Sequence, residues 1–194
     1  MRRWPLHAWL LVSVVVAACG TPPHKEMDQA QGALDAARAA GADRYATAEY
    51  DAASNALKLA TDAVAQRDYR LALNHALDSR ERAQNAARAA AENHARIRGE
   101  VERSMAEIAA VLAQANARIA AAETGRVPRR TLAAARRTLA QVNDDVQKAG
   151  AAMQANDYLA AQPALSGVKE RIEGVIASLD AAAPAQSSRR GRQG

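Results

Sequence analysis

Few side chains in this sequence could do chemistry, and the most conspicuous of them is its single cysteine, Cys19. This residue stands in the stretch VVVAACGT, directly after an apolar run and two alanines. A lone cysteine cannot form a disulfide within its own chain, and nothing around this one is typical of a packed core. The role of this thiol must therefore be inferred from the segment that precedes it.

A second group consists of arginines in a stretch that has no acidic residue between Glu123 and Asp144. These residues are Arg126, Arg129, Arg130, Arg136 and Arg137. One interpretation is a solvated face whose charge is balanced by acids on neighbouring helices. The other is a binding site for a polyanion, such as the phosphates of lipopolysaccharide or an acidic protein. Arg129 and Arg130 lie near a predicted helix start, where the helix dipole disfavours cations.

The remaining candidates are histidines and carboxylates. The four histidines are His7, His24, His75 and His94. His75 and His94 are nineteen positions apart, whereas two metal ligands on one helix face are three or four apart. The sequence has no Gly-rich phosphate loop and no Ser/His/Asp set, and Asp144 and Asp145 point to different faces of a helix. We therefore predict no enzymatic activity, no cofactor, no metal and no small-molecule substrate.

The distribution of charge argues against a nucleic-acid partner. The net charge is +5, from 26 basic and 21 acidic residues. Arg2 and Arg3 lie at the start, and Arg189, Arg190 and Arg192 lie in the last residues. Because these five account for the whole excess, the body between them is neutral and has no basic stripe. Both tryptophans lie near the start and there is no phenylalanine, so few aromatic rings remain for base stacking.

Residues 1–18 have the three parts of a secretory signal peptide: an arginine pair, an apolar run and two alanines. The apolar run is too short for a transmembrane helix, which needs ~20 apolar residues. Val16 to Cys19 reads VAAC and resembles the lipobox of bacterial lipoproteins. The resemblance implies that the leader is cut before Cys19, that its sulfur carries a diacylglycerol, and that its amino group is acylated, as with palmitate. Gly20, in place of an aspartate, implies the periplasmic face of a Gram-negative outer membrane.

Residues from about 26 to 180 carry a long helical pattern. Strong helix formers dominate this span, and proline occurs in it only at Pro128 and Pro163. Apolar or small residues recur at alternating steps of three and four, for instance Tyr158, Ala161, Leu165, Val168, Ile172, Val175 and Leu179. A period of 3.5 over this length is typical of a coiled-coil seam. We therefore predict an all-α fold, an elongated antiparallel helical bundle or coiled coil.

Breaks in the pattern divide the chain. Gly41 ends a first helix, and Thr47 can cap the next. Arg67-Asp68-Tyr69 is a tight turn in which the aspartate can accept amide hydrogens of the following helix, and Asn156-Asp157-Tyr158 matches it. The repeat predicts two three-helix hairpin units that share one long central helix.

The long helix runs from Tyr69 to Ala122, with Gly99 as its weak point and a possible kink. Its seam in the first half passes through Leu73, Ala76, Arg80, Ala83, Ala87 and Ala90, with the arginine reaching the seam's edge. The predicted segments are a lipoprotein signal peptide at 1–18, a lipidated cysteine and linker at 19–25, a first helical unit at 26–95, a second at 96–181, and a disordered Arg-rich tail at 182–194.

Two short stretches carry a family resemblance. Ala40 to Tyr50 reads AGADRYATAEY, and Asp68 to Ala72 reads DYRLA. With these stretches, residues 33–91 resemble the bacterial family called domain of unknown function 4398, and the second half resembles a weaker copy. Thr47 stands where that family usually has proline. The resemblance implies an envelope lipoprotein.

Two functions follow as expectations. The first is a non-enzymatic, membrane-anchored periplasmic lipoprotein that acts as a structural or adaptor helical rod, with an envelope protein as partner. The alternative is a binding module for an envelope polyanion, lipopolysaccharide or peptidoglycan-associated, that uses the cluster from Arg126 to Arg137 and the basic tail.

Overall fold

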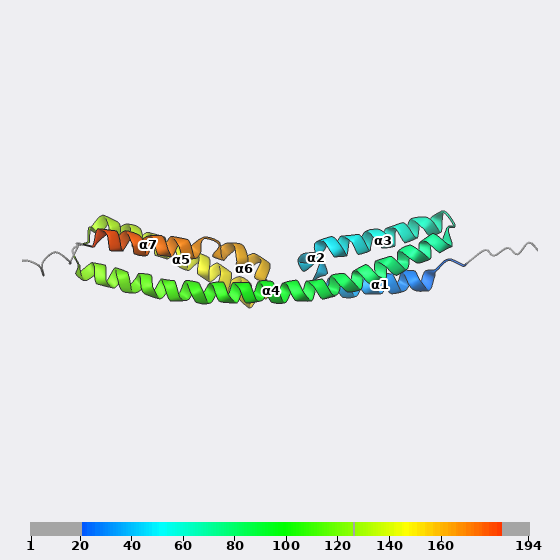
Figure 1. Cartoon of the computed structure of the whole chain (residues 1–194), viewed down its shortest axis with the longest axis horizontal. Coiled ribbons are helices and arrows are strands. Elements are labelled where there is room, and N and C mark those ends of the chain that lie inside the picture. The colour runs from blue at the N-terminus through cyan, green and yellow to red at the C-terminus, as the bar shows by residue number, and fades with distance from the viewer. Residues whose placement is uncertain (1–20, 126, 184–194) are drawn as a thin grey trace, which may run out of the picture. The chain divides into compact units, whose positions relative to one another are not determined.

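The computed structural model describes residues 21–125 and 127–183, and these form seven α-helices and no strand (Figure 1). The helices are α1 His24–Ala39, α2 Ala42–Tyr45, α3 Thr47–Ala65, α4 Tyr69–Thr124, α5 Arg129–Gln154, α6 Tyr158–Leu165 and α7 Val168–Ala182. The prediction of an all-α helical bundle is confirmed. The predicted signal peptide, Cys19, Arg126 and residues 184–194 of the predicted tail lie outside the described residues.

The chain divides into two compact units, unit 1 within Met1–Ala91 and unit 2 within Glu92–Gly194. Unit 1 contains α1, α2, α3 and the first part of α4, and unit 2 contains the rest of α4 with α5, α6 and α7. The sequence pattern placed this boundary slightly later, between residues 95 and 96. The α4 helix continues through Gly99 without a break. The elongated shape stays a prediction, which small-angle X-ray scattering of the full chain would test.

Two junctions connect α1, α2 and α3 in unit 1. Gly41 follows α1 in the left-handed conformation, with φ of 80°, and a Cβ at this position would lie 3.3 Å from the ring of Tyr45. The start of α3 differs from the prediction. The amide of Tyr50 donates to the carbonyl oxygen of Ala46 at 3.0 Å, so Thr47 is already helical and makes no side-chain cap. The prediction that Thr47 caps this helix is wrong, because the chain enters α3 one residue earlier.

The interior of unit 1 is mostly alanine. One cluster of buried residues consists of Leu34, Ala37, Ala42, Ala46, Tyr50, Ala53, Ala83, Ala86 and Ala90. Ser79 of α4 is fully buried, and its Oγ donates to the carbonyl oxygen of Ala53 in α3 at 2.8 Å. A buried hydroxyl without a partner would cost about 1–3 kcal/mol. This hydrogen bond therefore offsets the cost of burying a polar side chain between two closely packed helices.

The buried stripe of α4 in unit 1 contains the predicted seam residues Ala76, Ala83 and Ala90, but it differs from the prediction at every other seam position. The predicted seam residues Leu73, Arg80 and Ala87 are half-buried. The residue before each of them is buried instead, namely Ala72, Ser79 and Ala86. The cause is that α4 faces two partners here: Arg80 Nη1 donates to Gln29 Oε1 of α1 at 2.7 Å, and Ser79 contacts α3. The buried face of α4 therefore lies between the stripe that faces α1 and the stripe that faces α3.

The two predicted turns have the same backbone geometry. Arg67 and Asn156 are both left-handed, with φ of 60° and 56°. The following amides donate back across the helix end, Asp68 to Ala63 at 2.9 Å and Asp157 to Ala152 at 2.8 Å, the pattern of a Schellman motif. Each aspartate also caps the next helix: Asp68 Oδ1 accepts from the amide of Leu71 at 3.0 Å, and Asp157 Oδ1 from that of Ala160 at 3.2 Å. The predicted caps are confirmed.

Unit 2 buries larger side chains than unit 1. Its interior includes Ile97, Val101, Ile108, Ile119, Leu139, Val142, Tyr158, Leu165, Val168, Ile172, Val175 and Leu179. All seven seam residues predicted between Tyr158 and Leu179 are buried. The seam prediction for this segment is therefore confirmed.

The same segment is not one helix, however. The chain leaves α6 after Leu165 and enters α7 at Val168, with Gly167 left-handed at φ of 68°. Pro163 lies in the last turn of α6 and has no amide hydrogen to donate, which weakens this helix near its end. The sequence pattern concealed the break, because a step of three residues occurs both in a helix and across this turn.

Candidate functional site

The arginine cluster lies at the start of α5. Pro128 precedes this helix with φ of −57° and ψ of 132°, so Arg129 and Arg130 occupy its first two positions. Arg136 and Arg137 follow seven residues later, which is about two helical turns. Each later arginine therefore lies on nearly the same stripe of α5 as one of the first two. All four are exposed.

One arginine of the cluster is paired with an acid. Arg136 forms an ion pair with Glu123 near the end of α4. The interpretation of a face balanced by acids on a neighbouring helix fits this residue. Arg137 instead donates from Nε to the carbonyl oxygen of Ala133 in its own helix, at 3.3 Å.

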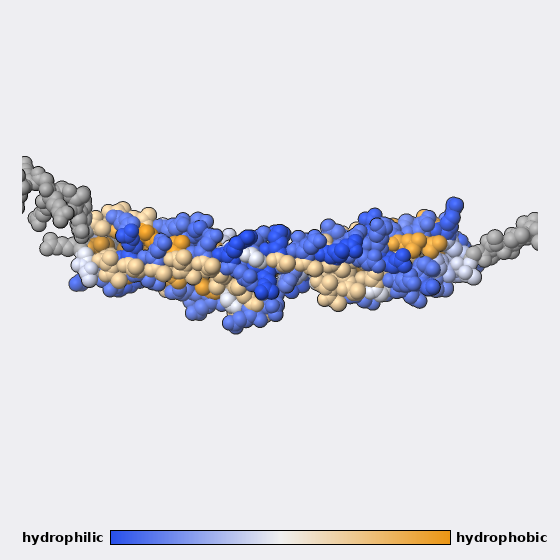
Figure 2. All heavy atoms as spheres, turned by 60° about the horizontal axis from the view of Figure 1, so that its bottom comes forward, coloured by the Kyte–Doolittle hydropathy of each residue, from blue (hydrophilic) through white to orange (hydrophobic). Residues whose placement is uncertain are grey.

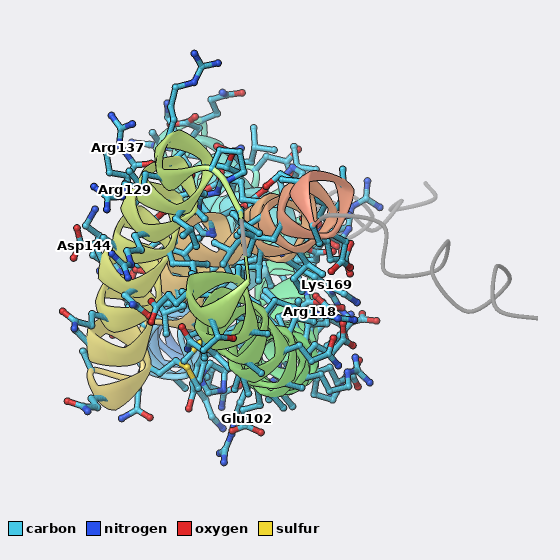
Figure 3. The ribbon with its side chains drawn as sticks, turned by 90° about the vertical axis from the view of Figure 1, so that its left-hand side faces the viewer. Glu102, Arg118, Arg129, Arg137, Asp144 and Lys169 are labelled. Carbon is cyan, nitrogen blue, oxygen red and sulfur yellow. The ribbon has the colours of Figure 1, made fainter. Side chains whose placement is uncertain are left out.

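The other arginines present a positive surface to solvent. Among the described residues, Arg129, Arg130 and Arg137 have no acidic side chain within ion-pair distance. Figure 3 shows Arg129 and Arg137 projecting from α5 away from α4 and α7. Arg129 and Arg130 lie in the first turn and add to the positive end of the helix dipole, an unfavourable arrangement of about 0.3–1 kcal/mol per charge. Binding of an anion would relieve this repulsion.

The nearest acid along this helix limits the extent of the positive surface. Asp144 lies two turns beyond Arg137 and points to the same side of α5 (Figure 3). The separation is about 10 Å along the axis, comparable with the screening length at physiological salt. The positive surface is therefore confined to the first three turns of α5.

Two acids elsewhere in unit 2, Asp145 and Glu107, are engaged with cations of α7. Arg171 of α7 donates to Asp145 of α5 at 2.6 Å, and this hydrogen bond lowers the pKa of the Asp145 carboxyl. Lys169 of α7 donates to Glu107 of α4 at 2.8 Å, which lowers the pKa of Glu107 and raises that of Lys169. These pairs join α7 to both of its neighbours and leave the acids unavailable to the arginine surface.

A shallow groove between α5 and α7 was not foreseen from the sequence. Its volume is about 220 Å³, and small residues such as Ala134 and Gly174 line it. The hydroxyls at its edge donate within their own helices, Thr138 to Ala134 at 3.3 Å and Ser178 to Val175 at 2.8 Å. Because these groups and Arg171 already have partners, the groove offers little polar recognition.

Of the histidines described by the structure, His94 packs against an aromatic ring, whereas His24 is exposed. His94 of α4 lies edge-on to the ring of Tyr158, with centroids 5.4 Å apart and planes at 70°. His75 is half-buried on the same helix. Within residues 21–125 and 127–183, no three His, Cys, Asp or Glu side chains are placed to hold a metal ion. None of the described helices has both the length and the apolar character of a membrane span.

Comparison of the chain with protein-family models, with curated proteins and with solved structures found no match. The resemblance of residues 33–91 to domain of unknown function 4398 therefore stays a prediction.

Proposed function

We propose that the protein is a non-enzymatic lipoprotein, anchored through Cys19 to the periplasmic face of the outer membrane, and that it acts there as a structural or adaptor protein. The observation that supports this role is the distribution of apolar and charged side chains between the interior and the surface. In the described residues the buried side chains are apolar except Ser79, and the charged side chains are spread over the helix surfaces. Such a molecule presents long helical faces to a partner.

The anchor is supported by the segment that precedes the helices. VAAC at Val16 to Cys19 resembles a lipobox, and the stretches AGADRYATAEY and DYRLA resemble an envelope lipoprotein family. Acyl chains at one residue add ~0.8 kcal/mol of membrane affinity per buried methylene. An anchored protein of this kind would bind an envelope protein partner through its helical faces.

Labelling with radioactive palmitate tests the anchor. We expect label in the wild-type protein and none in Cys19→Ala. Gly20→Asp is a matched control, because it keeps the cysteine and, by the lipoprotein resemblance, changes only the membrane in which the protein resides. Equal labelling of wild type and Cys19→Ala would refute the anchor.

Crosslinking followed by co-purification tests the adaptor role. We expect one envelope protein to be recovered with the full chain at both low and high salt, in contrast to the steep salt dependence of binding to a polyanion. Recovery of no specific protein in either buffer would count against this role.

A second function is supported by the exposed arginines of α5. We propose as the alternative a binding module for an envelope polyanion, through Arg126, Arg129, Arg130, Arg136, Arg137 and the basic tail. Lipopolysaccharide vesicles are the probe. Binding that falls steeply as salt rises would favour this alternative. Arg129→Gln, Arg130→Gln and Arg137→Gln should each weaken binding more than Arg136→Gln does, because Glu123 already neutralises Arg136.

A further inference from the structure

Unit 1 places leucines on its surface although its interior is alanine. The exposed large apolar residues of the described chain are Leu59 of α3 with 50% of its surface accessible, Leu71 of α4 with 42%, and Leu77 of α4 with 38%. All three belong to the hairpin that α3 and α4 form. Figure 2 shows strongly apolar side chains at the surface of unit 1 near the end where these two helices meet.

The three leucines gather near the turn of that hairpin. Leu59 is six residues before the end of α3, whereas Leu71 and Leu77 are two and eight residues after the start of α4. At 1.5 Å per residue, they lie within about 12 Å of the turn along the helix axes. They therefore lie at one end of unit 1, although the six residues between Leu71 and Leu77 place these two side chains about 120° apart around α4. The hairpin end is defined here as Leu59, Leu71 and Leu77 with the turn between them.

The start of α4 that carries Leu71 is uncovered because α1 is too short to reach the turn, whereas Leu77 lies level with the first turn of α1. Gln29, the sixth residue of α1, bonds Arg80, the twelfth residue of α4. The chain enters α1 at the same end of unit 1 as the α3–α4 turn (Figure 1). The hairpin therefore extends about six residues, or ~9 Å, beyond the start of α1. Over this length only two helices pack together, and a third partner is missing.

The position of Cys19 in the sequence indicates what lies at this end. Five residue steps separate Cys19 from His24, the first residue of α1. Such a segment spans at most about 17 Å. If Cys19 carries acyl chains, as the proposed function requires, α1 starts within this distance of the bilayer. The hairpin end extends beyond that start and can reach the lipid surface.

The turn itself also suits a lipid surface. Arg67 lies in the turn and Arg70 in the first turn of α4, and both are exposed. Within the described residues neither has an ion-pair partner. Arginines beside exposed leucines can bind headgroup phosphates while the apolar side chains enter the interfacial region.

We propose that the hairpin end, Leu59, Leu71 and Leu77 with Arg67 and Arg70, is a second membrane contact that lies in the interfacial layer of the bilayer that holds the Cys19 anchor. This inference rests on the proposed function, because the anchor holds the hairpin end at the membrane. The contact holds unit 1 against the bilayer in one orientation, instead of leaving it to pivot about the anchor.

A tryptophan reporter can test the contact in the full, processed chain. Both natural tryptophans, Trp4 and Trp9, lie in the predicted leader, so a mature chain carries none. Gln66→Trp places one reporter at the turn, and Ala48→Trp places a matched reporter in the first turn of α3, about 27 Å away along that helix. Both positions are exposed.

The two variants are reconstituted in phospholipid vesicles with and without brominated acyl chains. We expect the emission of Gln66→Trp to shift to shorter wavelength and to be quenched by the brominated lipid, whereas that of Ala48→Trp stays unquenched. Adding Leu59→Gln, Leu71→Gln and Leu77→Gln to the Gln66→Trp chain should abolish the quenching. Circular dichroism of this chain should be unchanged, since the three leucines are exposed.

Other outcomes separate this inference from the proposed function. A palmitate-labelled chain in which Gln66→Trp is not quenched, or is quenched equally with the leucines replaced, overturns the inference alone. A wavelength shift without quenching, together with crosslinks between two copies, means that a second copy covers the leucines and also overturns it. A chain that carries no palmitate refutes the proposed function, and the inference falls with it.

Discussion

Unit 1 and unit 2 are both helical, yet they are filled in different ways. Unit 1 packs alanines such as Ala53, Ala83 and Ala90, each fully buried, around Leu34 and Tyr50. Unit 2 packs branched aliphatic side chains, and Ile172, Val142 and Val168 are among those without accessible surface.

The difference separates two ways of stabilising a helical bundle. Alanine lets helix backbones approach closely, but each buried methyl contributes only ~0.8 kcal/mol, against ~1.5–3 kcal/mol for a buried valine, leucine or isoleucine. Unit 1 therefore depends on helix propensity, on its caps and on close backbone contact. It also has leucines that its interior does not use, which is why we assign them to a contact outside the molecule.

The largest effect should come from the two tyrosines that follow the capping aspartates. Tyr158 in unit 2 is 6% exposed and packs on His94, whereas Tyr69 in unit 1 is half-buried. Tyr158→Ala should lower the free energy of unfolding by about 3–5 kcal/mol, and Tyr69→Ala by clearly less. Urea denaturation followed by circular dichroism measures both. Equal losses would contradict the difference between the two units.

Core substitutions that change side-chain volume in opposite directions should destabilise both units, for different reasons. Ile172→Ala in unit 2 leaves a cavity and should cost about 2–5 kcal/mol, with Ile172→Val as the mild control at about 0.5–1.5 kcal/mol. Ala83→Leu in unit 1 should cost about 1–3 kcal/mol, because the closely packed helices cannot accommodate the added volume. An Ala83→Leu protein as stable as wild type would show that unit 1 is loosely packed. The same denaturation experiment provides the comparison.

The two capping aspartates should contribute similarly to stability, whereas the interiors of the two units contribute differently. Asp68→Ala and Asp157→Ala each remove one bond to a helix amide and should each cost about 0.5–2 kcal/mol. Asn at either position keeps an acceptor oxygen and should retain most of the stability. Thermal melts of the four variants test this. Unchanged melting temperatures for both alanine variants would refute the structural repeat of the turns.

The smallest effect should be a pH dependence in unit 2. Arg171 lowers the pKa of Asp145 in the folded state, so the pair stabilises the fold above the unfolded pKa of about 3.9. This contribution is lost as the pH falls through the lowered folded value. Asp145→Asn should therefore reduce the drop in melting temperature below about pH 4. Asp144→Asn is the control, since it removes a neighbouring charge without the bond to Arg171. An unchanged acid profile for Asp145→Asn would contradict the assignment.

Local patterns predicted the arginine surface only in part. An acid-free stretch at the start of a helix identified Arg129, Arg130, Arg136 and Arg137 as a group. The separation of Arg136 from the others required the fold, because Glu123 reaches it from the end of α4. Helix periodicity predicts which side chains share a stripe of one helix, but it does not predict which neighbouring helix faces that stripe.

By itself, the sequence determined the helical class, the left-handed Gly41 and the two capped aspartate turns. Each of these depends on backbone preferences and hydrogen bonds over a few neighbouring residues. The tertiary structure decided that Ala72, Ser79 and Ala86 are buried in place of Leu73, Arg80 and Ala87. Where alanines occupy adjacent stripes, the hydrophobic pattern favours neither one strongly. The directions from which α1 and α3 approach α4 then select the buried face, and they leave the leucines of the hairpin end outside.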